Sequence, residues 1–564
     1  MEGARGSRPA LDSALGVSRR ELLWVLGWSL VVLGLTSLPY LWCAALETDT
    51  HVFGGLVYDV EDVRTYLAEM RQGARGAWLL HLPYTSEDHP RAFVHGLYLL
   101  LGRLVPLAGG SLLAVFHLAR WALGLAALVS VYRFVAFFTP WMGTRRVAWL
   151  LAAFSSGLGW LLVLLGRSQW LGDMPVDFWV PEAFTLPVLY SFPHIALSLA
   201  LLLEALLGFV QAVERSDLRP ALRGGLLTLA LGFVVPFDVP VVYGVMGAYL
   251  LALLLGWRRL ARQALLAALV VGGISLPGLA YNLWVFTFNG AFREWARQNL
   301  GFSPHPAHFL VAYAPLALLA LPGIVHVLQR GDRRGAFLVA WLLAAAALLY
   351  TPFNLQRRLL IGLHPVLCLL AAVGLTRWFL PRLGWSRAFS AIQEWSRGRY
   401  RRKGLRRLAV YGVVWALVPS NLLLLAGPMI QALEHVPPLY LPREAVDAAD
   451  WLAAHAPAES VVLASPAVGN FLPVRSDVWV FLGHGAITLQ YDAKLEEARR
   501  FYRAGGQTPE AAYQWLLDRG IRYVYFGPDE KRLVGGESAD LFALPYLQLA
   551  YENQGVSLFA VARP

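Results

Sequence analysis

Long apolar runs constrain this chain more than any other feature of its sequence. Runs of about 20 residues with few charges recur between residues 22 and 432, and that length lets an α-helix cross the hydrocarbon core of a membrane. Hydrophobic residues make up 57% of the 564 positions and charged residues only 15%, which is too few charges to cover a soluble protein of this size. The sequence therefore predicts a polytopic α-helical membrane protein with about eleven transmembrane helices.

The predicted spans are separated by short polar or basic loops. Two short helices are expected to meet at the sequence Pro236-Phe237-Asp238-Val239-Pro240, at or just within the outer leaflet. The other spans are expected at about 22–45, 111–138, 146–166, 191–212, 264–288, 309–328, 336–350, 359–380 and 408–432.

Basic residues orient these helices, because Lys and Arg collect in cytoplasmic loops. Arg19 and Arg20 precede the first helix, so the N-terminus is expected in the cytoplasm. Arg145 and Arg146 follow the second span and are also expected inside, which leaves no crossing for the apolar segment 90–107. We interpret that segment as an amphipathic helix on the outer membrane surface. The net charge of +11 is accounted for by these loops, and nucleic-acid binding is not expected.

The composition changes near residue 433, where apolar runs shorten and charges return. We therefore predict two domains, a transmembrane domain over residues 1–432 and a soluble α/β domain over residues 433–564. The second domain is expected on the extracytoplasmic side of the inner or plasma membrane. Its expected elements are helices at Glu444–His455 and Thr508–Arg519, strands at Val461–Leu463 and Ile521–Phe526, and a hairpin over Tyr546–Val561.

Acidic residues gather in the first external loop. Asp59, Glu61 and Asp62 lie within four positions just after the first span, and Glu87 and Asp88 lie at the far end of the loop. Carboxylates in such a place can serve as a general base or as substrate or metal ligands. Ordinary solvated loop acids are the alternative interpretation.

The second external loop adds three more acids, Asp173, Asp177 and Glu182. Acids at two separate places on one face of the membrane can supply both a base and a ligand for metal or substrate. The chain has no phosphate loop, dinucleotide fingerprint or zinc-protease motif. Two cysteines are too few for a disulfide framework or a zinc site.

Further candidate binding residues stand at the outer ends of later helices. Arg357 and Arg358, after Gln356, break the positive-inside trend, and guanidinium groups match phosphate oxygens well. Snorkelling to phospholipid headgroups would also explain this pair. His194 opens a span and could bond a phosphate or a substrate hydroxyl, or cap the helix start. Asp238, between two prolines, is a costly acid near membrane depth that usually faces a cavity.

Together these features resemble the GT-C class of membrane glycosyltransferases, including the protein O-mannosyltransferases, the aminoarabinose transferases and bacterial family 39-like enzymes. The segment Asp62-Val63-Arg64-Thr65-Tyr66 fits the Asp-x-x-x-Tyr form of the class, and Asp173 or Asp177 stands where a second acid follows the third helix. The segment Phe353–Arg358 is similar to the late basic turn of bacterial members. Most relatives have Asp-Glu near the first motif, whereas Asp59 and Glu61 precede Asp62 here, which leaves the catalytic acid open.

The resemblance implies sugar transfer from a polyprenyl-phosphate donor within the membrane to an acceptor on the outer face. Asp62 or Asp59 would act as base in an inverting displacement, and Arg357 and Arg358 would stabilise the leaving lipid phosphate. Some members hold a divalent cation, Mg or Mn, between acids of both loops, and others do not. The acceptor, whether glycan, lipid or protein, is not predicted. A transporter or lipid flippase is the alternative, favoured by Asp238 in a proline-broken helix pair.

Overall fold

The computed structural model describes residues 16–257, 262–396, 399, 401–535 and 537–563. Eight helices within these ranges are long and apolar enough to span a membrane. Helices α19 (Arg402–Ala416) and α20 (Pro419–Gln431) meet at a bend of 47° and give a ninth span if they are counted together. The two remaining predicted spans are the 16-residue helices α10 (Arg219–Val234) and α15 (Arg333–Leu348). The predicted polytopic helical architecture is confirmed.

The long spans lie where the apolar runs predicted them. A 3-10 turn, η4 (Pro236–Asp238), separates α10 from the next helix at the predicted Pro-rich break. The spans are α1 (Arg19–Ala45), α4 (Leu112–Phe138), α5 with α6 (Met142–Phe154 and Gly159–Leu164), α9 (Pro193–Arg215), η4 with α11 (Val239–Trp257), α12 (Arg262–Phe288), α14 (Pro306–Gln329), and the run from η5 (Gln356–Leu360) through α16 (Leu363–Gly374) and the π-helical turn Leu375–Phe379 to α17 (Leu380–Gly384).

Contacts divide the chain into two compact units, which are described separately. Unit 1 consists of Met1–Leu38, Ala119–Ala280 and Gly301–Ala426, and unit 2 consists of Pro39–Leu118, Tyr281–Leu300 and Gly427–Pro564. The first loop and the C-terminal region thus form one body. The domain boundary near residue 433 stays a prediction.

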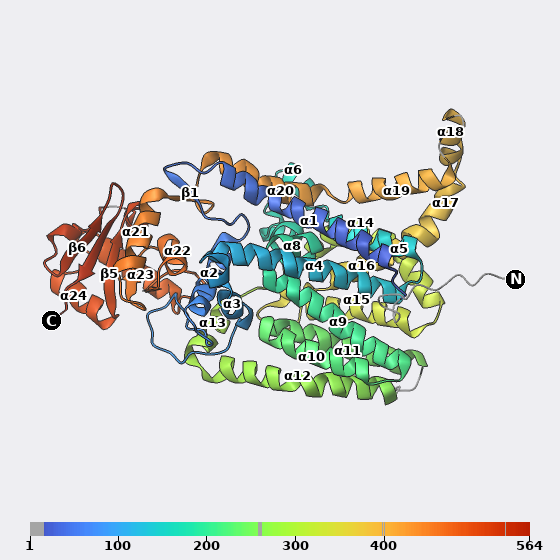
Figure 1. The fold of residues 1–564 in the computed structure, drawn as a ribbon, viewed down its shortest axis with the longest axis horizontal. Helices are drawn as coiled ribbons and strands as arrows, with labels where there is room; N and C mark the ends of the chain where they lie inside the picture. Colours follow the sequence, from blue (N-terminus) through green and yellow to red (C-terminus); the bar gives the residue numbers. More distant parts are fainter. Residues whose placement is uncertain (1–15, 258–261, 397–398, 400, 536, 564) are drawn as a thin grey trace. The chain divides into compact units, whose positions relative to one another are not determined.

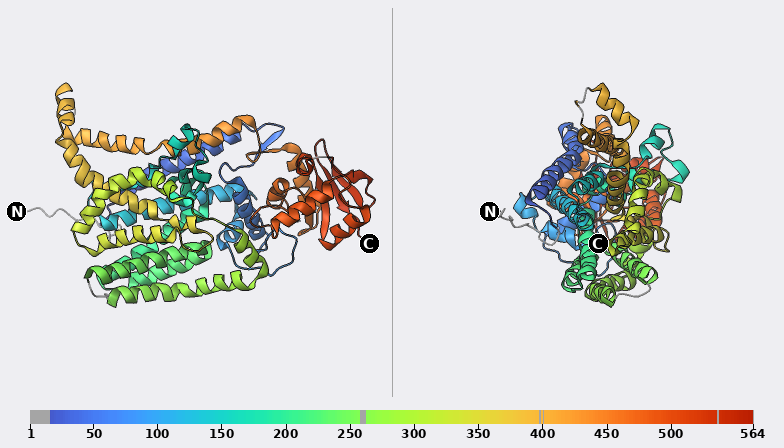
Figure 2. Two further views of the ribbon diagram at one scale, coloured as in Figure 1. Left: turned by 180° about the vertical axis from the view of Figure 1, so that it is seen from behind. Right: turned by 90° about the vertical axis from the view of Figure 1, so that its right-hand side faces the viewer.

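Unit 1 is a bundle of spanning helices in which α9, α10 and α11 run side by side (Figures 1 and 2). Helices α14 and α16 pack closely against each other. A Cβ atom at Gly323 would lie 2.0 Å from the carbonyl oxygen of Leu370, and one at Gly374 would lie 2.0 Å from the carbonyl oxygen of Leu319. Small residues let helix backbones approach in this way, which is how dispersion forces hold helices together in lipid.

Unit 2 contains a five-stranded mixed sheet of order β4-β3-β5-β7-β6 (Figure 1). Strand β3 is parallel to β4 and β5, and β7 is antiparallel to β5 and β6. The predicted α/β domain, its strands and its terminal hairpin are confirmed. The elements are β3 (Val461–Leu463), β4 (Trp479–Val480), β5 (Ile521–Phe526), β6 (Leu547–Glu552) and β7 (Ser557–Val561), with α21 (Arg443–His455), α22 (Pro466–Arg475), α23 (Tyr491–Tyr502), α24 (Pro509–Asp518) and α25 (Pro528–Val534).

The first loop joins this domain through backbone and side chains. Strand β1 (His51–Phe53), which follows α1, pairs antiparallel with β2 (Tyr440–Pro442), which follows α20. Helix α13 (Gly290–Gln298) adds Phe292 and Trp295 to an apolar core of unit 2 that residues of the first loop and of the sheet share. The chain segments after α1 and after α20 therefore lie side by side.

The helix expected over residues 90–107 begins later and is interrupted. It consists of α3 (Gly96–Gly102) and the 3-10 turn Val105–Ala108, because Ala92 is held extended by a backbone bridge to Leu80. Helix α3 packs on α2 (Val60–Ala74), a helix where the sequence predicts an acidic loop. A position of α3 on the membrane surface stays a prediction. Gly73 and Gly102 allow this contact, since a Cβ atom at either would lie 2.1 Å from a backbone oxygen.

Candidate functional site

The acidic start of the first loop is the N-terminus of α2. Asp59 is the N-cap residue with φ of 45°, a left-handed conformation that Asp adopts more readily than most residues. Glu61 and Asp62 occupy the first helical turn, where the helix dipole stabilises carboxylates. Asp59 and Glu61 are exposed, whereas Asp62 is half-buried. The structure therefore gives the three acids different environments.

Asp62 is bound by a histidine from the C-terminal part of unit 2. Nε2 of His484 lies 2.7 Å from Oδ1 of Asp62, and the two side chains are 11% and 29% exposed. The backbone N–H of Ala486 donates to Nδ1 of the same ring at 3.3 Å. A neutral ring that accepts at Nδ1 carries its proton on Nε2, so His484 donates to Asp62 and orients its carboxylate.

Sequence reasoning missed His484. It stands between Gly483 and Gly485, a pattern that indicates a turn, and it is 422 positions from Asp62. A titratable residue in a turn of the C-terminal domain was its one signal. The partner of that residue depends on the tertiary structure.

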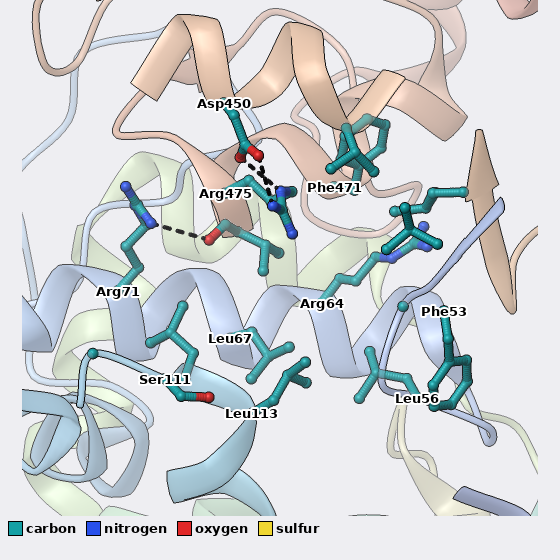
Figure 3. Close-up of a pocket in the computed structure, with 17 residues that line it drawn as sticks. Phe53, Leu56, Arg64, Leu67, Arg71, Ser111, Leu113, Asp450, Phe471 and Arg475 are labelled. Atoms are coloured by element: carbon teal, nitrogen blue, oxygen red, sulfur yellow. Dashed lines mark hydrogen bonds and ion pairs between the residues drawn. The ribbon is translucent and has the colours of Figure 1, made fainter. Parts of the chain in front are cut away.

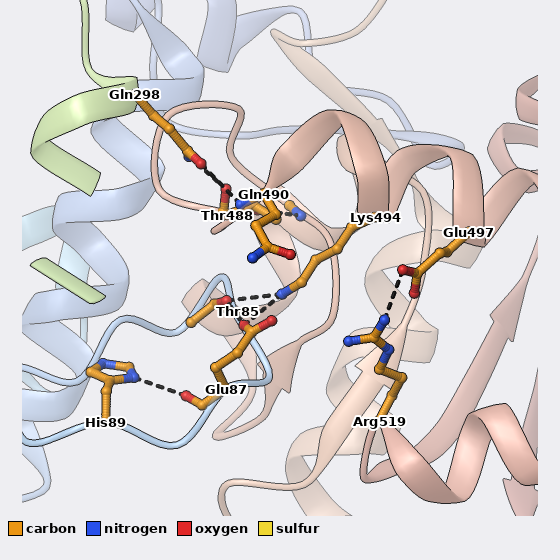
Figure 4. Close-up of polar contacts among 10 residues, drawn as sticks. Thr85, Glu87, His89, Gln298, Thr488, Gln490, Lys494, Glu497 and Arg519 are labelled. Carbon is orange, nitrogen blue, oxygen red and sulfur yellow. Dashed lines mark hydrogen bonds and ion pairs between the residues drawn. The ribbon is translucent and has the colours of Figure 1, made fainter. Parts of the chain in front are cut away.

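The acids at the far end of the first loop have a different environment. Nζ of Lys494, on α23, lies 2.6 Å from Oε2 of Glu87 and 2.9 Å from Oγ1 of Thr85 (Figure 4). Burial alone would raise the pKa of Glu87, but the charge and hydrogen bonds of Lys494 outweigh it and lower that pKa. Asp88 is exposed beside this pair. Glu87 therefore ties the loop to α23, which accounts for its position without a ligand.

In unit 1 the structure brings Glu182, Asp238 and Arg358 together from the 3-10 turns η3 (Pro181–Ala183), η4 and η5. Nε of Arg358 lies 4.0 Å from Oε1 of Glu182, and its guanidinium carbon lies 5.3 Å from the centre of the Phe237 ring. Asp238 is 1% exposed and accepts a hydrogen bond from Oγ of Ser198. This bond satisfies Oδ2 of Asp238, whereas Oδ1 is buried without a hydrogen-bond partner among the residues that the structure describes.

The predicted arginine pair is divided by its surroundings. The guanidinium carbon of Arg357 lies 4.1 Å from the centre of the Trp179 ring, in a cation–π contact. Oε1 of Gln356 accepts from the N–H of Ser303 at 3.1 Å, and its Nε2 donates to the carbonyl of Thr351 at 2.6 Å. Gln356 thus holds two loops together.

Three further predicted site residues, Asp177, Asp173 and His194, belong to unit 1. Asp177 is 2% exposed, and its Oδ2 accepts from the N–H of Gly159 at 3.0 Å. Burial raises the pKa of the Asp177 carboxyl. Asp173 is half-buried in the same loop, and His194 is buried at the start of α9 with its ring 5.3 Å from that of Phe192. Their functional roles stay predictions.

Within the described ranges of the chain, no group of three or more His, Cys, Asp or Glu side chains is placed to hold a metal ion. The divalent cation used by some GT-C enzymes therefore stays a prediction for this chain.

Known proteins match this chain in structure but not in sequence. No protein-family model and no curated protein matches it. The apo oligosaccharyltransferase of Archaeoglobus fulgidus matches with a TM-score of 0.53 at 12% identity, over 89% of this chain and 69% of that chain. ArnT from Cupriavidus metallidurans in its apo state matches with a TM-score of 0.52 at 14% identity, over 96% of this chain and 99% of that chain.

Arabinofuranosyltransferase AftD from Mycobacteria matches with a TM-score of 0.53 at 17% identity, over 97% of this chain and 40% of that chain. All three neighbours are GT-C glycosyltransferases. At these identities the likeness concerns the fold. The chain therefore has a GT-C-like fold, a polytopic helical membrane body with a soluble domain, as its sequence resemblance predicted.

Proposed function

We propose that this protein transfers a sugar from a polyprenyl-phosphate-linked donor to an acceptor at the extracytoplasmic face of the membrane. The hydrogen bond between His484 and Asp62 carries the proposal, because it singles out the acid of the Asp-x-x-x-Tyr motif among its neighbours. The GT-C-like fold supports the donor class. Another structure of the Archaeoglobus fulgidus enzyme, AglB, with a TM-score of 0.50 at 11% identity, is in complex with an inhibitory peptide and a dolichol-phosphate.

The proposed reaction is one inverting displacement with Asp62 as general base. The Asp62 carboxylate takes the proton of the acceptor hydroxyl while that oxygen forms a bond to the anomeric carbon. The bond from the anomeric carbon to the phosphate oxygen breaks, and the lipid phosphate leaves with the electron pair. His484 does not accept the proton, since Nε2 already carries one and Nδ1 accepts from Ala486. It acts as a positioning residue.

The leaving phosphate gains negative charge, and the proposal assigns its stabilisation to Arg358. The support lies within unit 1. The Arg358 side chain is 17% exposed and is held against Phe237 and near Glu182 at the start of a spanning segment. That start is where a lipid headgroup meets a helix end. The stacking of Arg357 on Trp179 makes it the lesser candidate.

The pairing of β1 with β2 supports a reaction on one face. It joins the first loop, which carries the acids, to the chain segment that leads into the five-stranded sheet. The positive-inside pattern of the sequence makes the side on which this loop lies extracytoplasmic in this proposal.

The test is Asp62→Asn. The new side chain still accepts from His484 through Oδ1 but is no longer a base, so the contact survives and the chemistry does not. We expect loss of transfer, seen by mass analysis as accumulation of the lipid-linked sugar and loss of the modified acceptor among cell-envelope glycans. Asp88→Asn, a change to an exposed acid of the same loop, is the matched control and should leave transfer intact. Full transfer in Asp62→Asn, Asp59→Asn and the double variant would refute the mechanism.

A further inference from the structure

A cavity of about 290 Å³ lies in unit 2 against the face of α2 that carries Arg64, Leu67 and Arg71 (Figure 3). Its other walls come from residues 110–113 at the start of α4 and from α21 and α22. Arg64 and Asp62 are two positions apart, which separates them by about 200° around the helix axis. The cavity therefore opens on a face of α2 other than the one that meets His484.

The charges around this cavity do not cancel. Arg475 forms a two-pronged pair with Asp450 at 3.0 and 2.9 Å, and Arg71 is paired with Asp477 at 2.7 Å. Arg64 is 6% exposed and donates to two neutral oxygens, Oδ1 of Asn470 at 3.4 Å and the carbonyl of Pro438 at 3.1 Å.

Among the residues that the structure describes, no carboxylate oxygen lies within 4.0 Å of the Arg64 guanidinium, although Glu61 acts on it at longer range. Burial lowers the pKa of Arg64 to about 10, with Tyr84 and Glu61 opposing that shift, so the group remains charged at neutral pH. A buried cation is costly unless an anion accompanies it. Arg64 therefore leaves one positive charge in the wall for a ligand to match.

The rest of the wall suits an apolar chain. Phe53, Leu56, Leu113 and Phe471 line the cavity beside the guanidinium groups. Helix α4, which begins at Leu112, is long and apolar enough to span a membrane, so this wall adjoins the end of a candidate span. At the start of α4 the hydroxyl of Ser111 accepts from the N–H of Ala114 at 3.1 Å. The other N–H groups of a first helical turn have no partner within the helix and carry partial positive charge, which adds to the attraction for an anion.

We propose that this cavity binds the phosphate headgroup of a lipid, with Arg64 and the first turn of α4 on the phosphate and the apolar wall on the start of the chain. The volume is at the low end for ligand sites, so it fits a headgroup and the first atoms of its chain. The site lies apart from the proposed base Asp62, and its existence does not depend on sugar transfer.

The test measures binding of dihexanoyl phosphatidic acid to the purified full-length protein in detergent by calorimetry, with dihexanoyl phosphatidylcholine and inorganic phosphate as comparison ligands. Arg64→Gln should raise the Kd about tenfold or more, since a hydrogen bond to a charged group is lost. Arg91→Gln is the matched control, because it removes the same charge from an exposed ion pair with Glu459 and should change the Kd less than about twofold.

Leu113→Trp fills the cavity, leaves Arg64 in place and should also weaken lipid binding. This variant keeps the proposal testable if Arg64→Gln fails to fold. Unchanged affinity in both variants would overturn the proposal. Inorganic phosphate binding as tightly as the lipid would overturn the lipid assignment in favour of free phosphate. Asp62→Asn should bind the lipid as the wild type does, so this result is independent of the transfer assay.

Discussion

The donor bond from His484 to Asp62 can be tested with two substitutions that differ in which ring nitrogen they imitate. In Gln the side-chain nitrogen is as many bonds from the backbone as Nε2 of His, whereas the polar atoms of Asn match Nδ1. His484→Gln therefore keeps a donor toward Asp62, and His484→Asn keeps the contact with the N–H of Ala486 while losing that donor.

The magnitude follows from the geometry. A hydrogen bond to a charged group contributes about 1.5–3 kcal/mol, and the 29% exposure of Asp62 lets water replace part of it, so about 2 kcal/mol is expected. At about 1.4 kcal/mol per tenfold, His484→Asn should lower the rate of transfer roughly 30-fold. His484→Gln should lose less than about fivefold.

The assay is consumption of a polyprenyl-phosphate sugar by membranes that contain equal amounts of each variant, followed by mass analysis of the lipid. The loss should appear in the maximal rate more than in donor affinity, because His484 acts on the base. His455→Asn, at an exposed histidine of α21, is the control. Equal activity of the Asn and Gln variants of His484 would refute the positioning role, whether both are active or both are lost.

Two further predictions concern stability of unit 2. Glu87→Gln should lower the free energy of unfolding by about 3 kcal/mol and Lys494→Met by only about 1 kcal/mol. The first change leaves the Lys494 ammonium, which is 2% exposed, without its anion, whereas the second leaves the Glu87 carboxylate, which is 37% exposed, in reach of water. Denaturant unfolding in detergent measures both values, and an equal or reversed order would contradict this reasoning. Burial raises the pKa of Glu530 from 4.5 to about 7, so the folded state favours the protonated carboxyl. The contribution of Glu530 to the free energy of unfolding is therefore present below pH 4.5 and is lost as pH rises through 7. At about 1.4 kcal/mol per pKa unit, the expected loss is about 3 kcal/mol. The free energy of unfolding should therefore differ less between pH 5 and pH 8 in Glu530→Gln than in the wild type. The same difference in both proteins would count against this assignment.

Much of the fold was predictable because its cause is local. A run of about 20 apolar residues is a membrane span wherever it occurs, since lipid leaves backbone polar groups no partner outside the helix. The short apolar segments Val461–Leu463 and Ile521–Phe526 likewise predicted strands at the positions where β3 and β5 lie. The helix expected over residues 90–107 begins only at Gly96, because a backbone bridge between Leu80 and Ala92 holds the preceding segment extended.

The candidate site was predictable in residue type but not in grouping. The sequence alone determined that acids, arginines and a histidine stand in loops between spans, because position relative to apolar runs is a one-dimensional property. The tertiary structure decided that His484 donates to Asp62, that Lys494 binds Glu87, and that Arg358 lies near Glu182. Hydrogen bonds and ion pairs act over a few ångströms, and only folding brings groups hundreds of positions apart within that distance.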